Sequence, residues 1–443
     1  MKIAIAGTGY VGLVTGVCLA HIGIHDIVCV DIDEERINTL RDGRSPIYEN
    51  GLDDMLKEVI KKEKISFTTD IKKAYKDAEC IFIAVGTPER SDGSANLEYI
   101  KKVSKEIANN IEKDCLVVIK STVPCGTNDF IEGYIKKNLK NNVWMEVASN
   151  PEFLAQGTAV YDTLNANRLV IGTQSKKAED ILRNVYQGFE MPIVSTDRSS
   201  AEMIKYASND FLALKISYMS DIANLCEIVG ANIDDVSYGM SFDDRIGSKF
   251  LRAGIGYGGS CFPKDTKALH WLSNSNGYEL KTISAAIEVN EAQKLKLIKK
   301  SDEDIDSYDG IKAAVLGVTF KPGTDDLREA PSIVNINSLI ERGADVYIYD
   351  PVGMNNAKKI FGNQVKYCDD YKDAIKDASI CFIMTEWDEI KNISPDEFIK
   401  LMKEVRIYDG RNCYDIDSMD REGVSYYSIG RKRINNIENN TLK

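Results

Sequence analysis

The fold is decided by the stretch Lys2-Ile3-Ala4-Ile5-Ala6-Gly7-Thr8-Gly9-Tyr10-Val11-Gly12 near the start of the chain. Its first five residues predict a buried parallel strand, and the apolar stretch after the glycines predicts a helix. Three glycines spaced as G-x-G-x-x-G between a strand and a helix are typical of dinucleotide binding. Gly7 makes the tight turn, Gly9 lets the backbone approach a pyrophosphate, and Gly12 lets the helix pack on the strand.

An acidic residue ends the next predicted strand. Asp31 lies 19 residues after Gly12, where a carboxylate would hold the ribose hydroxyls of an adenosine. A 2′-phosphate would meet this negative charge. The sequence therefore predicts NAD as the cofactor, in preference to NADP.

Composition excludes several classes of protein. The chain has 443 residues, 43% of them hydrophobic, and a net charge of −12, which favours two or three domains and argues against general binding to nucleic acid or to an anionic membrane. No signal peptide is recognisable, and no apolar run approaches the length of a membrane span. The ten cysteines include no C-x-x-C pair and there are only three histidines, so we expect no metal site, no disulfide framework and a reducing cytoplasm.

Polar residues follow three further predicted strands. Thr87, Thr122 and Glu152 each come shortly after a run of apolar residues. Open α/β sheets bind ligands at the carboxyl ends of their strands, so these side chains are predicted to line a site.

A continuous helical pattern runs from about Ser199 to Val229. A helix of this length would extend about 45 Å and is typical of a bridge between domains or subunits. Lys205 and Asn209 lie four residues apart on it, so they share one face.

From Ile311 the opening pattern recurs. Residues 377–385 repeat residues 77–85 in order and spacing, but Gly317-Val318-Thr319-Phe320-Lys321-Pro322-Gly323 replaces the three-glycine fingerprint. We predict a second nucleotide-binding-type domain for a different phosphorylated ligand, with Lys321 as its point charge.

A glycine-rich loop with a cysteine lies between the two halves. It reads GIGYGGSCFPKD at residues 254–265, and Lys264 follows Cys261 three residues later. Glycines let a backbone come close to a ligand, and a nearby cation favours the reactive thiolate over the thiol. From this segment alone, a buried core thiol is the competing interpretation.

The combination of NAD, a nucleotide-like ligand and a cysteine indicates one reaction class. Oxidation of an alcohol to a carbonyl needs no cysteine, whereas an aldehyde can be taken further on a thiolate. The thiolate adds to the aldehyde, the thiohemiacetal loses a second hydride, and water cleaves the thioester. We therefore expect two NAD and one water to be consumed per substrate, with a carboxylate as product.

Several separated motifs occur together between residues 1 and 430. They are Gly7-Thr8-Gly9-Tyr10-Val11-Gly12, Val85-Gly86-Thr87-Pro88, Ser121-Thr122-Val123-Pro124, Asn150-Pro151-Glu152-Phe153-Leu154, the segment 256–265 and the segment 320–329. Jointly they resemble the UDP-glucose/GDP-mannose dehydrogenase family of nucleotide-sugar dehydrogenases. Together with the repeated pattern, the resemblance implies an α/β protein of two Rossmann-like doubly wound domains joined by a long central helix.

The expected domains follow from this resemblance. They are an NAD-binding domain at 1–198, a central helical dimerisation domain with the cysteine loop at 199–300, and a UDP-sugar-binding domain at 301–430. We expect the polar tail at 431–443 to be disordered.

The resemblance also implies roles for individual residues. Cys261 would be the nucleophile. Lys205 and Asn209 would stabilise the oxyanion. Asp265 and Thr122 would position water and serve proton transfer, and Glu152 would stand at the sugar end. The implied cofactor contacts are Gly7, Gly9, Tyr10, Val11, Gly12, Asp31, Arg36, Thr87, Thr122, Lys264 and Arg328. The implied substrate contacts are Glu152, Phe153, Leu154, Lys205, Asn209, Arg245, Phe250, Leu251, Arg252, Ala253, Gly254, Gly258 and Lys321, with Arg245 reaching across a subunit interface.

One departure from the family pattern stands out. The family has Arg-Glu-Gly after the Pro-Glu-Phe-Leu element, whereas this chain has Ala155-Gln156-Gly157. The glutamine keeps the size and the hydrogen bonding but loses the charge and any function as a base.

The resemblance further implies UDP-glucose as the substrate, UDP-glucuronate as the product, and a homodimer. The same chemistry on a UDP-N-acetylhexosamine or on GDP-mannose stays open, because the motif residues are largely shared. A two-electron β-hydroxyacid dehydrogenase would share the first half of the fold, yet it would need neither Cys261 nor the second nucleotide domain. A binding module without activity would not need Cys261, Lys205, Asn209 and Asp265 together.

Overall fold

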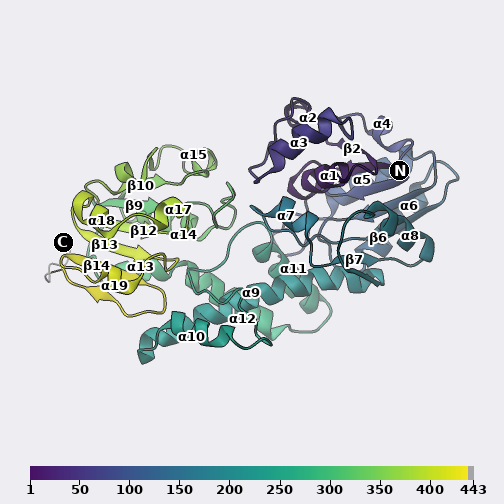
Figure 1. Cartoon of the computed structure of the whole chain (residues 1–443). Helices are drawn as coiled ribbons and strands as arrows, with labels where there is room; N and C mark the ends of the chain where they lie inside the picture. Colours follow the sequence, from purple (N-terminus) through teal and green to yellow (C-terminus); the bar gives the residue numbers. More distant parts are fainter. Residues whose placement is uncertain (438–443) are drawn as a thin grey trace. The chain divides into compact units, whose positions relative to one another are not determined.

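The structure is a computed structural model that describes residues 1–437, and it forms two compact units (Figure 1). The first unit comprises Met1–Ser208 and the second begins at Asn209. Helix α9, Arg198–Val229, runs through the boundary as one helix of 32 residues, which confirms the predicted long helix. The predicted division into three domains stays a prediction.

The first unit is built on an eight-stranded sheet in the order β3-β2-β1-β4-β5-β6-β7-β8, parallel except where β6 meets β7. Its first six strands have the order of a doubly wound dinucleotide-binding sheet. The strands are β1 Lys2–Ala6, β2 Asp26–Val30, β3 Ile65–Thr68, β4 Cys80–Ile83, β5 Cys115–Ile119, β6 Met145–Ser149, β7 Leu169–Gly172 and β8 Ile193–Thr196. The helices are α1 Tyr10–Ile22, α2 Glu34–Arg41, α3 Leu52–Lys61, α4 Ile71–Tyr75, α5 Glu98–Asn110, α6 Thr127–Asn138, α7 Ala159–Leu164 and α8 Lys176–Val185.

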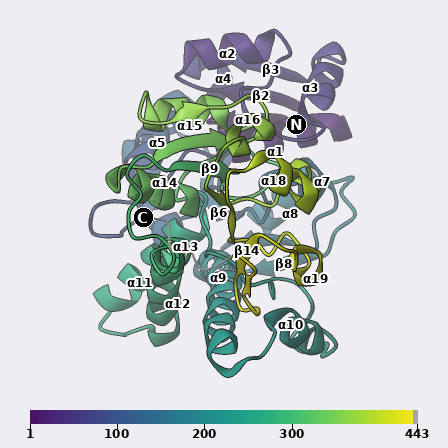
Figure 2. The same ribbon diagram turned by 90° about the vertical axis from the view of Figure 1, so that its left-hand side faces the viewer.

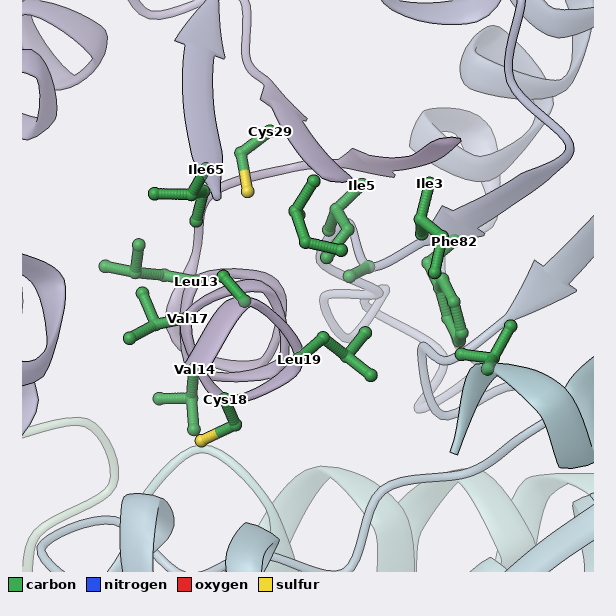
Figure 3. Packing of buried hydrophobic residues seen from close by; sticks show 14 of the residues in the cluster. Ile3, Ile5, Leu13, Val14, Val17, Cys18, Leu19, Cys29, Ile65 and Phe82 are labelled. Atoms are coloured by element: carbon green, nitrogen blue, oxygen red, sulfur yellow. The ribbon is translucent and has the colours of Figure 1, made fainter. Parts of the chain in front are cut away.

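Side-chain alternation along β1 divides the core of this unit into two layers. Ile3 and Ile5 point to the face covered by α1, α3 and α7, whereas Ala4 and Ala6 point to the face covered by α4, α5 and α6. Figure 3 shows the first layer, in which Leu13 and Val17 of α1 pack below the strands. Both faces of the sheet are therefore buried, which explains why its central strands are apolar throughout.

The second unit repeats this plan on a seven-stranded sheet in the order β11-β10-β9-β12-β13-β14-β15. The strands are β9 Lys312–Leu316, β10 Asp345–Tyr349, β11 Lys366–Tyr367, β12 Ile380–Ile383, β13 Val405–Asp409, β14 Val424–Ser428 and β15 Ile434–Asn435. The helices that follow α9 are α10 Ile233–Ser241, α11 Phe262–Ser275, α12 Lys281–Lys294, α13 Lys296–Ser301, α14 Pro331–Glu341, α15 Met354–Phe361, α16 Tyr371–Ile375, α17 Asp388–Lys391, α18 Pro395–Leu401 and α19 Ile416–Met419. Helices α11 and α12 lie side by side (Figure 2).

The expectation of a disordered tail from residue 431 is wrong for the part of it that the structure describes. Strand β15 pairs antiparallel with β14, so it extends the second sheet. Arg431 is buried and donates to Ser428 Oγ and Tyr426 Oη, each at 2.8 Å. Polar composition suggested a solvated tail, but these side chains find partners on the sheet. Residues 438–443 lie outside the described residues.

Within residues 1–437, no helix is both long and apolar enough to cross a bilayer.

Candidate active site

The glycine-rich turn of the first unit presents an open helix end. Gly7 has a φ of 95°, and α1 begins after Gly9 without a side-chain cap on its first N–H groups. A Cβ on Gly12 would lie 2.1 Å from the Gly7 carbonyl oxygen, whereas a Cβ on Gly9 would meet nothing within 4 Å. Uncapped N–H groups at a helix N-terminus bind phosphate, so this end fits the pyrophosphate of a dinucleotide.

Asp31 stands at the carboxyl end of β2 beside this turn. Its carboxylate accepts hydrogen bonds from the Thr8 amide at 2.7 Å and the Thr8 hydroxyl at 2.8 Å, and Arg36 Nη1 lies 3.8 Å away. Burial opposes ionisation of Asp31, but the hydrogen bonds from Thr8 and Asp33, together with Arg36, lower its pKa overall. A fixed negative charge thus stands where the sequence predicted an acceptor for ribose hydroxyls.

The ends of β4 and β5 are tied together. The Thr87 hydroxyl donates to the Thr122 carbonyl at 2.9 Å, and the Ser121 hydroxyl donates to the Val85 carbonyl at 2.6 Å. Two predicted site residues, Thr87 and Thr122, therefore lie next to each other at the carboxyl edge of the sheet, where ligands of such sheets bind.

Glu152 is held by an interaction that sequence reasoning missed. Lys120 Nζ lies 2.9 Å from Glu152 Oε2, and it also contacts Asn150 Oδ1 at 3.2 Å and Tyr186 Oη at 3.3 Å. Burial opposes ionisation of Glu152, but the charge and hydrogen bond of Lys120 lower its pKa overall. Burial by itself lowers the pKa of Lys120, whereas the charge of Glu152 raises it, and the overall pKa of Lys120 is raised. The sequence signal that could have indicated this pair is the position of Lys120 directly after a buried strand.

The segment after Glu152 carries an aromatic ring that two cations contact. The Arg168 guanidinium lies 4.1 Å from the centre of the Phe153 ring, and Lys205 Nζ lies 5.2 Å from it. Lys205 is buried. The ring thus holds the ammonium group of the predicted oxyanion lysine by a cation–π interaction.

A second missed residue, Glu49, organises the loop that contains Gln156. Its carboxylate accepts from the Gly157 amide at 2.7 Å, from the Ala159 amide at 2.8 Å and from the Tyr10 hydroxyl. The predicted cofactor residue Tyr10 is therefore connected to the 155–159 loop. No local sequence signal links Glu49 to a loop more than 100 residues away, because the link is tertiary.

In the second unit, Cys261 lies at the N-terminus of α11. Of the ten cysteines it is the exposed one, while seven are buried and two are intermediate. The hydrogen bond to Asp326 is the first cause that raises the pKa of Arg328, and a Coulombic interaction with Cys261 adds to it. Cys261 thus stands exposed at a helix N-terminus and close to a guanidinium.

Asp265 lies one turn into α11 and is buried. It accepts a hydrogen bond from Asn209 Nδ2 at 2.7 Å, and its other oxygen is paired with Lys264 Nζ. Three of the predicted site residues are thereby brought together around one carboxylate.

The loop before Cys261 is held in place by side chains that bind its backbone groups. The Tyr257 amide donates to Asn290 Oδ1 at 2.7 Å, and Arg411 Nη1 donates to the Gly256 carbonyl at 3.2 Å. A Cβ on Gly258 would lie 2.4 Å from the Glu329 carbonyl oxygen. Gly258 is thus packed against the segment that contains Arg328, whereas Gly254 of the predicted substrate loop lies against Gly410 and Arg411. Arg411 was not predicted, although it follows a buried strand.

Two predicted substrate residues each contact a residue close by in the sequence. Lys321 Nζ lies 5.7 Å from the centre of the Phe320 ring. Arg245 is exposed and forms an ion pair with Asp243 at 2.6 Å. A role for either residue stays a prediction.

Comparisons with known proteins cover almost the whole chain. Models of the UDP-glucose/GDP-mannose dehydrogenase family match its NAD binding domain at residues 1–190, its central domain at 199–292 and its UDP binding domain at 314–416. The chain is 47% identical to UDP-glucose 6-dehydrogenase YwqF of Bacillus subtilis (strain 168), over 98% of each chain.

Two solved structures are similar in fold as well. A UDP-glucose dehydrogenase from the hyperthermophilic archaeon Pyrobaculum islandicum matches with a TM-score of 0.91 and 34% identity, over 97% of this chain and 98% of that one. A UDP-D-ManNAc dehydrogenase from Pyrococcus horikoshii matches with a TM-score of 0.85 and 28% identity, over 97% and 99%.

Proposed function

The chain belongs to the UDP-glucose/GDP-mannose dehydrogenase family, and from this we propose that it oxidises the C6 alcohol of UDP-glucose to the carboxylate of UDP-glucuronate. It is an NAD-dependent oxidoreductase. One sugar alcohol, two NAD and one water give one carboxylate, two NADH and three protons. The alcohol oxidation supplies two electrons and the aldehyde oxidation supplies the other two.

The first unit has the features that bound NAD requires. The uncapped N-terminus of α1 suits the pyrophosphate, and Asp31 suits the ribose hydroxyls. When bound, NAD supplies the hydride acceptor. The residues of this chain orient the cofactor and hold the charges that develop on the substrate.

Cys261 has the central role in the proposed chemistry. The C6 alcohol loses a hydride and a proton to become an aldehyde. Cys261 Sγ then adds to the aldehyde carbon, and the thiol proton passes to the aldehyde oxygen, which becomes the hydroxyl of the thiohemiacetal. The thiohemiacetal loses a second hydride and its hydroxyl proton to become a thioester. Water adds to the thioester carbonyl, the C–S bond breaks, and the carboxylate leaves as Cys261 regains its proton.

The remaining roles follow from charge. Lys205 and Asn209 stabilise the oxyanions of the alcohol, thiohemiacetal and hydrolysis stages. Asp265 and Thr122 position the water and accept protons, with Glu152 at the sugar end. The observation that carries the proposal is the exposure of Cys261 at a helix N-terminus, since a core thiol could not meet a substrate.

The stoichiometry of NADH tests this function. Purified protein is mixed with UDP-glucose and excess NAD, and NADH and UDP-glucuronate are quantified together. Two NADH per sugar are expected from the wild type, and no carboxylate from Cys261→Ala. Cys125→Ala, a substitution of a cysteine of intermediate exposure, serves as the matched control and should keep two NADH per sugar. One NADH per sugar, or unchanged turnover by Cys261→Ala, would refute the thioester mechanism.

A second candidate substrate is a UDP-N-acetylhexosamine, which the similarity to the Pyrococcus horikoshii UDP-D-ManNAc dehydrogenase favours. GDP-mannose is a third candidate within the same family name. Comparing kcat/KM for the three nucleotide sugars separates them, and the highest value is expected for UDP-glucose. If none of the three nucleotide sugars gave NADH, the protein would be a binding module without activity.

We further propose a homodimer that uses the second-unit part of α9. Phe211, Tyr218 and Leu225 recur every seven residues and are each more than half exposed. Side chains spaced by seven share one face of a helix, and a stripe of this kind is typical of a helix–helix interface. Analytical ultracentrifugation should give a dimer for the wild type and a monomer for Leu225→Glu.

A reducing compartment such as the cytoplasm is also proposed. All ten cysteines are free, including the buried ones, which suits an environment that keeps thiols reduced.

A further inference from the structure

Asp210 is a buried acid that the proposed mechanism does not use. It follows Asn209 on α9 and is 1% exposed. Neither Asp210 Oδ1 nor Asp210 Oδ2 has a hydrogen-bond partner in the described structure. Burying a carboxylate without hydrogen bonds is costly, and such a group commonly keeps its proton instead.

The surroundings of Asp210 connect it with the site. Its neighbour Asn209 donates to Asp265 at 2.7 Å, and the carboxyl groups of Asp210 and Asp265 are close enough to interact as like charges. Burial is the largest cause that raises the pKa of Asp210, to about 8, and Asp265 adds to it while Lys264 opposes it.

Other titratable groups lie around Asp210 on neighbouring elements. From the loop before Cys261 comes Tyr257, whose pKa burial raises to about 12, so this phenol stays neutral. Glu291 of α12 interacts electrostatically with Tyr257 and also raises the pKa of this phenol. Lys264 on α11 remains paired with Asp265, and on α9 itself Tyr206 lies one turn before Asp210.

We propose that Asp210 is a positioning residue that acts through Asp265: its buried carboxyl holds a proton at neutral pH and loses it as the pH rises, and the negative charge that appears favours proton uptake at Asp265. The inference rests on the proposed function, in which Asp265 accepts protons. Three protons are released per sugar in that reaction, so a stronger proton acceptor beside the substrate speeds it. A like charge favours the protonated form of its neighbour, which is the physical basis of the effect.

The pH profile of Asp210→Asn tests this inference. The asparagine mimics the protonated acid and cannot ionise. The rate of NADH formation in a single turnover is measured from pH 6.5 to pH 9 for both proteins. The ratio of wild-type to variant rate should grow about tenfold across this range, with its midpoint near pH 8. Asp221→Asn, at an exposed acid on α9, is the matched control, and its ratio should stay flat.

Stability gives a readout that does not depend on turnover. A raised pKa in the folded state means that the wild type loses stability as the pH rises from the ordinary aspartate value of about 3.9 toward 8. The Tm of Asp210→Asn relative to the wild type should therefore increase between pH 5 and pH 8. If the variant does not fold, the infrared band of a protonated buried carboxyl in the wild type should still disappear with a midpoint near pH 8.

The outcomes separate the two proposals. A flat rate ratio, a constant Tm difference or the absence of the carboxyl titration overturns the role of Asp210. Absence of turnover by the wild type with any nucleotide sugar overturns the proposed function and, with it, this role.

Discussion

Lys120 Nζ lies 2.9 Å from Glu152 Oε2, and the two residues follow adjacent parallel strands, β5 and β6, at the carboxyl edge of the first sheet. Lys120 is buried, and the Glu152 side chain is only 16% exposed. Each charge needs the other, because an isolated charge in such a place is strongly disfavoured. The pair therefore fixes Glu152 at the end of β6 before any substrate binds.

Removing one partner of this pair should destabilise the first unit. Lys120→Met leaves the Glu152 charge unpaired and should cost about 3–5 kcal/mol, lowering Tm by roughly 10 °C. Glu152→Gln should cost less than Lys120→Met, and the double variant should be more stable than the sum of the two single effects. Thermal melts of the four proteins measure this coupling. An unchanged Tm in Lys120→Met would contradict the importance of the pair.

The same pair predicts the pH range over which its stabilisation is lost. The pKa of Glu152 is lowered in the folded protein, so its contribution is present above the ordinary carboxyl value of about 4.3 and is lost as the pH falls below it. The pKa of Lys120 is raised, so its contribution is present below about 10.4 and is lost as the pH rises above it. Melts from pH 3 to pH 7 should show a smaller stability difference between wild type and Glu152→Gln at the acidic end.

Two glycines at the start of α1 should have different roles, Gly12 in the stability of the fold and Gly9 in the binding of NAD. Gly12→Ala places a Cβ against the Gly7 carbonyl and should lower Tm by roughly 5–10 °C even without NAD. Gly9→Ala meets no protein atom, so folding should be unaffected while NAD binds about tenfold more weakly or worse. Calorimetric titration with NAD and thermal melts of the two variants provide the comparison. Equal loss of stability in both would argue against a cofactor role for Gly9.

Cofactor choice should depend on Asp31. Asp31→Ser removes the carboxylate that Thr8 holds, so kcat/KM for NAD should fall by about tenfold or more. The relative rate with NADP should rise, because Arg36 then faces a 2′-phosphate without a competing negative charge. Glu34→Ser, at an exposed acid on α2, is the control and should leave the preference for NAD unchanged.

A substitution at Gln156 tests the departure from the family pattern. The Gln156→Glu variant restores a carboxylate that could accept a proton, so activity should be kept or increased. Steady-state kinetics with UDP-glucose measure this, with Gln156→Ala as a control that removes the amide without adding charge. A large loss of activity in Gln156→Glu alone would mean that this protein requires a neutral side chain in the 155–159 loop.

Much of the fold could be predicted because its signals are local. Residues 2–12 contain a strand, a tight turn and a helix start within one short segment, and the second half repeats the strand pattern. Helix α9 could be predicted for the same reason, since its periodicity is continuous. The order of residues 431–437 could not be predicted from their polar composition. Asp234 of α10, which pairs with Arg431, is remote in sequence, and the pairing of β15 with β14 depends on the sheet edge.

The sequence by itself determined the two-sheet architecture, the preference for NAD and the candidate nucleophile Cys261, because these depend on glycine spacing, a strand-ending acid and a short loop. Only the tertiary structure decided that Lys120 pairs with Glu152, that Glu49 holds the 155–159 loop, and that Asp210 is buried near Asp265 with no hydrogen-bond partner among residues 1–437. Burial and pairing of charges arise when distant segments pack together. No local pattern encodes which carboxylate will find a cation and which will keep its proton.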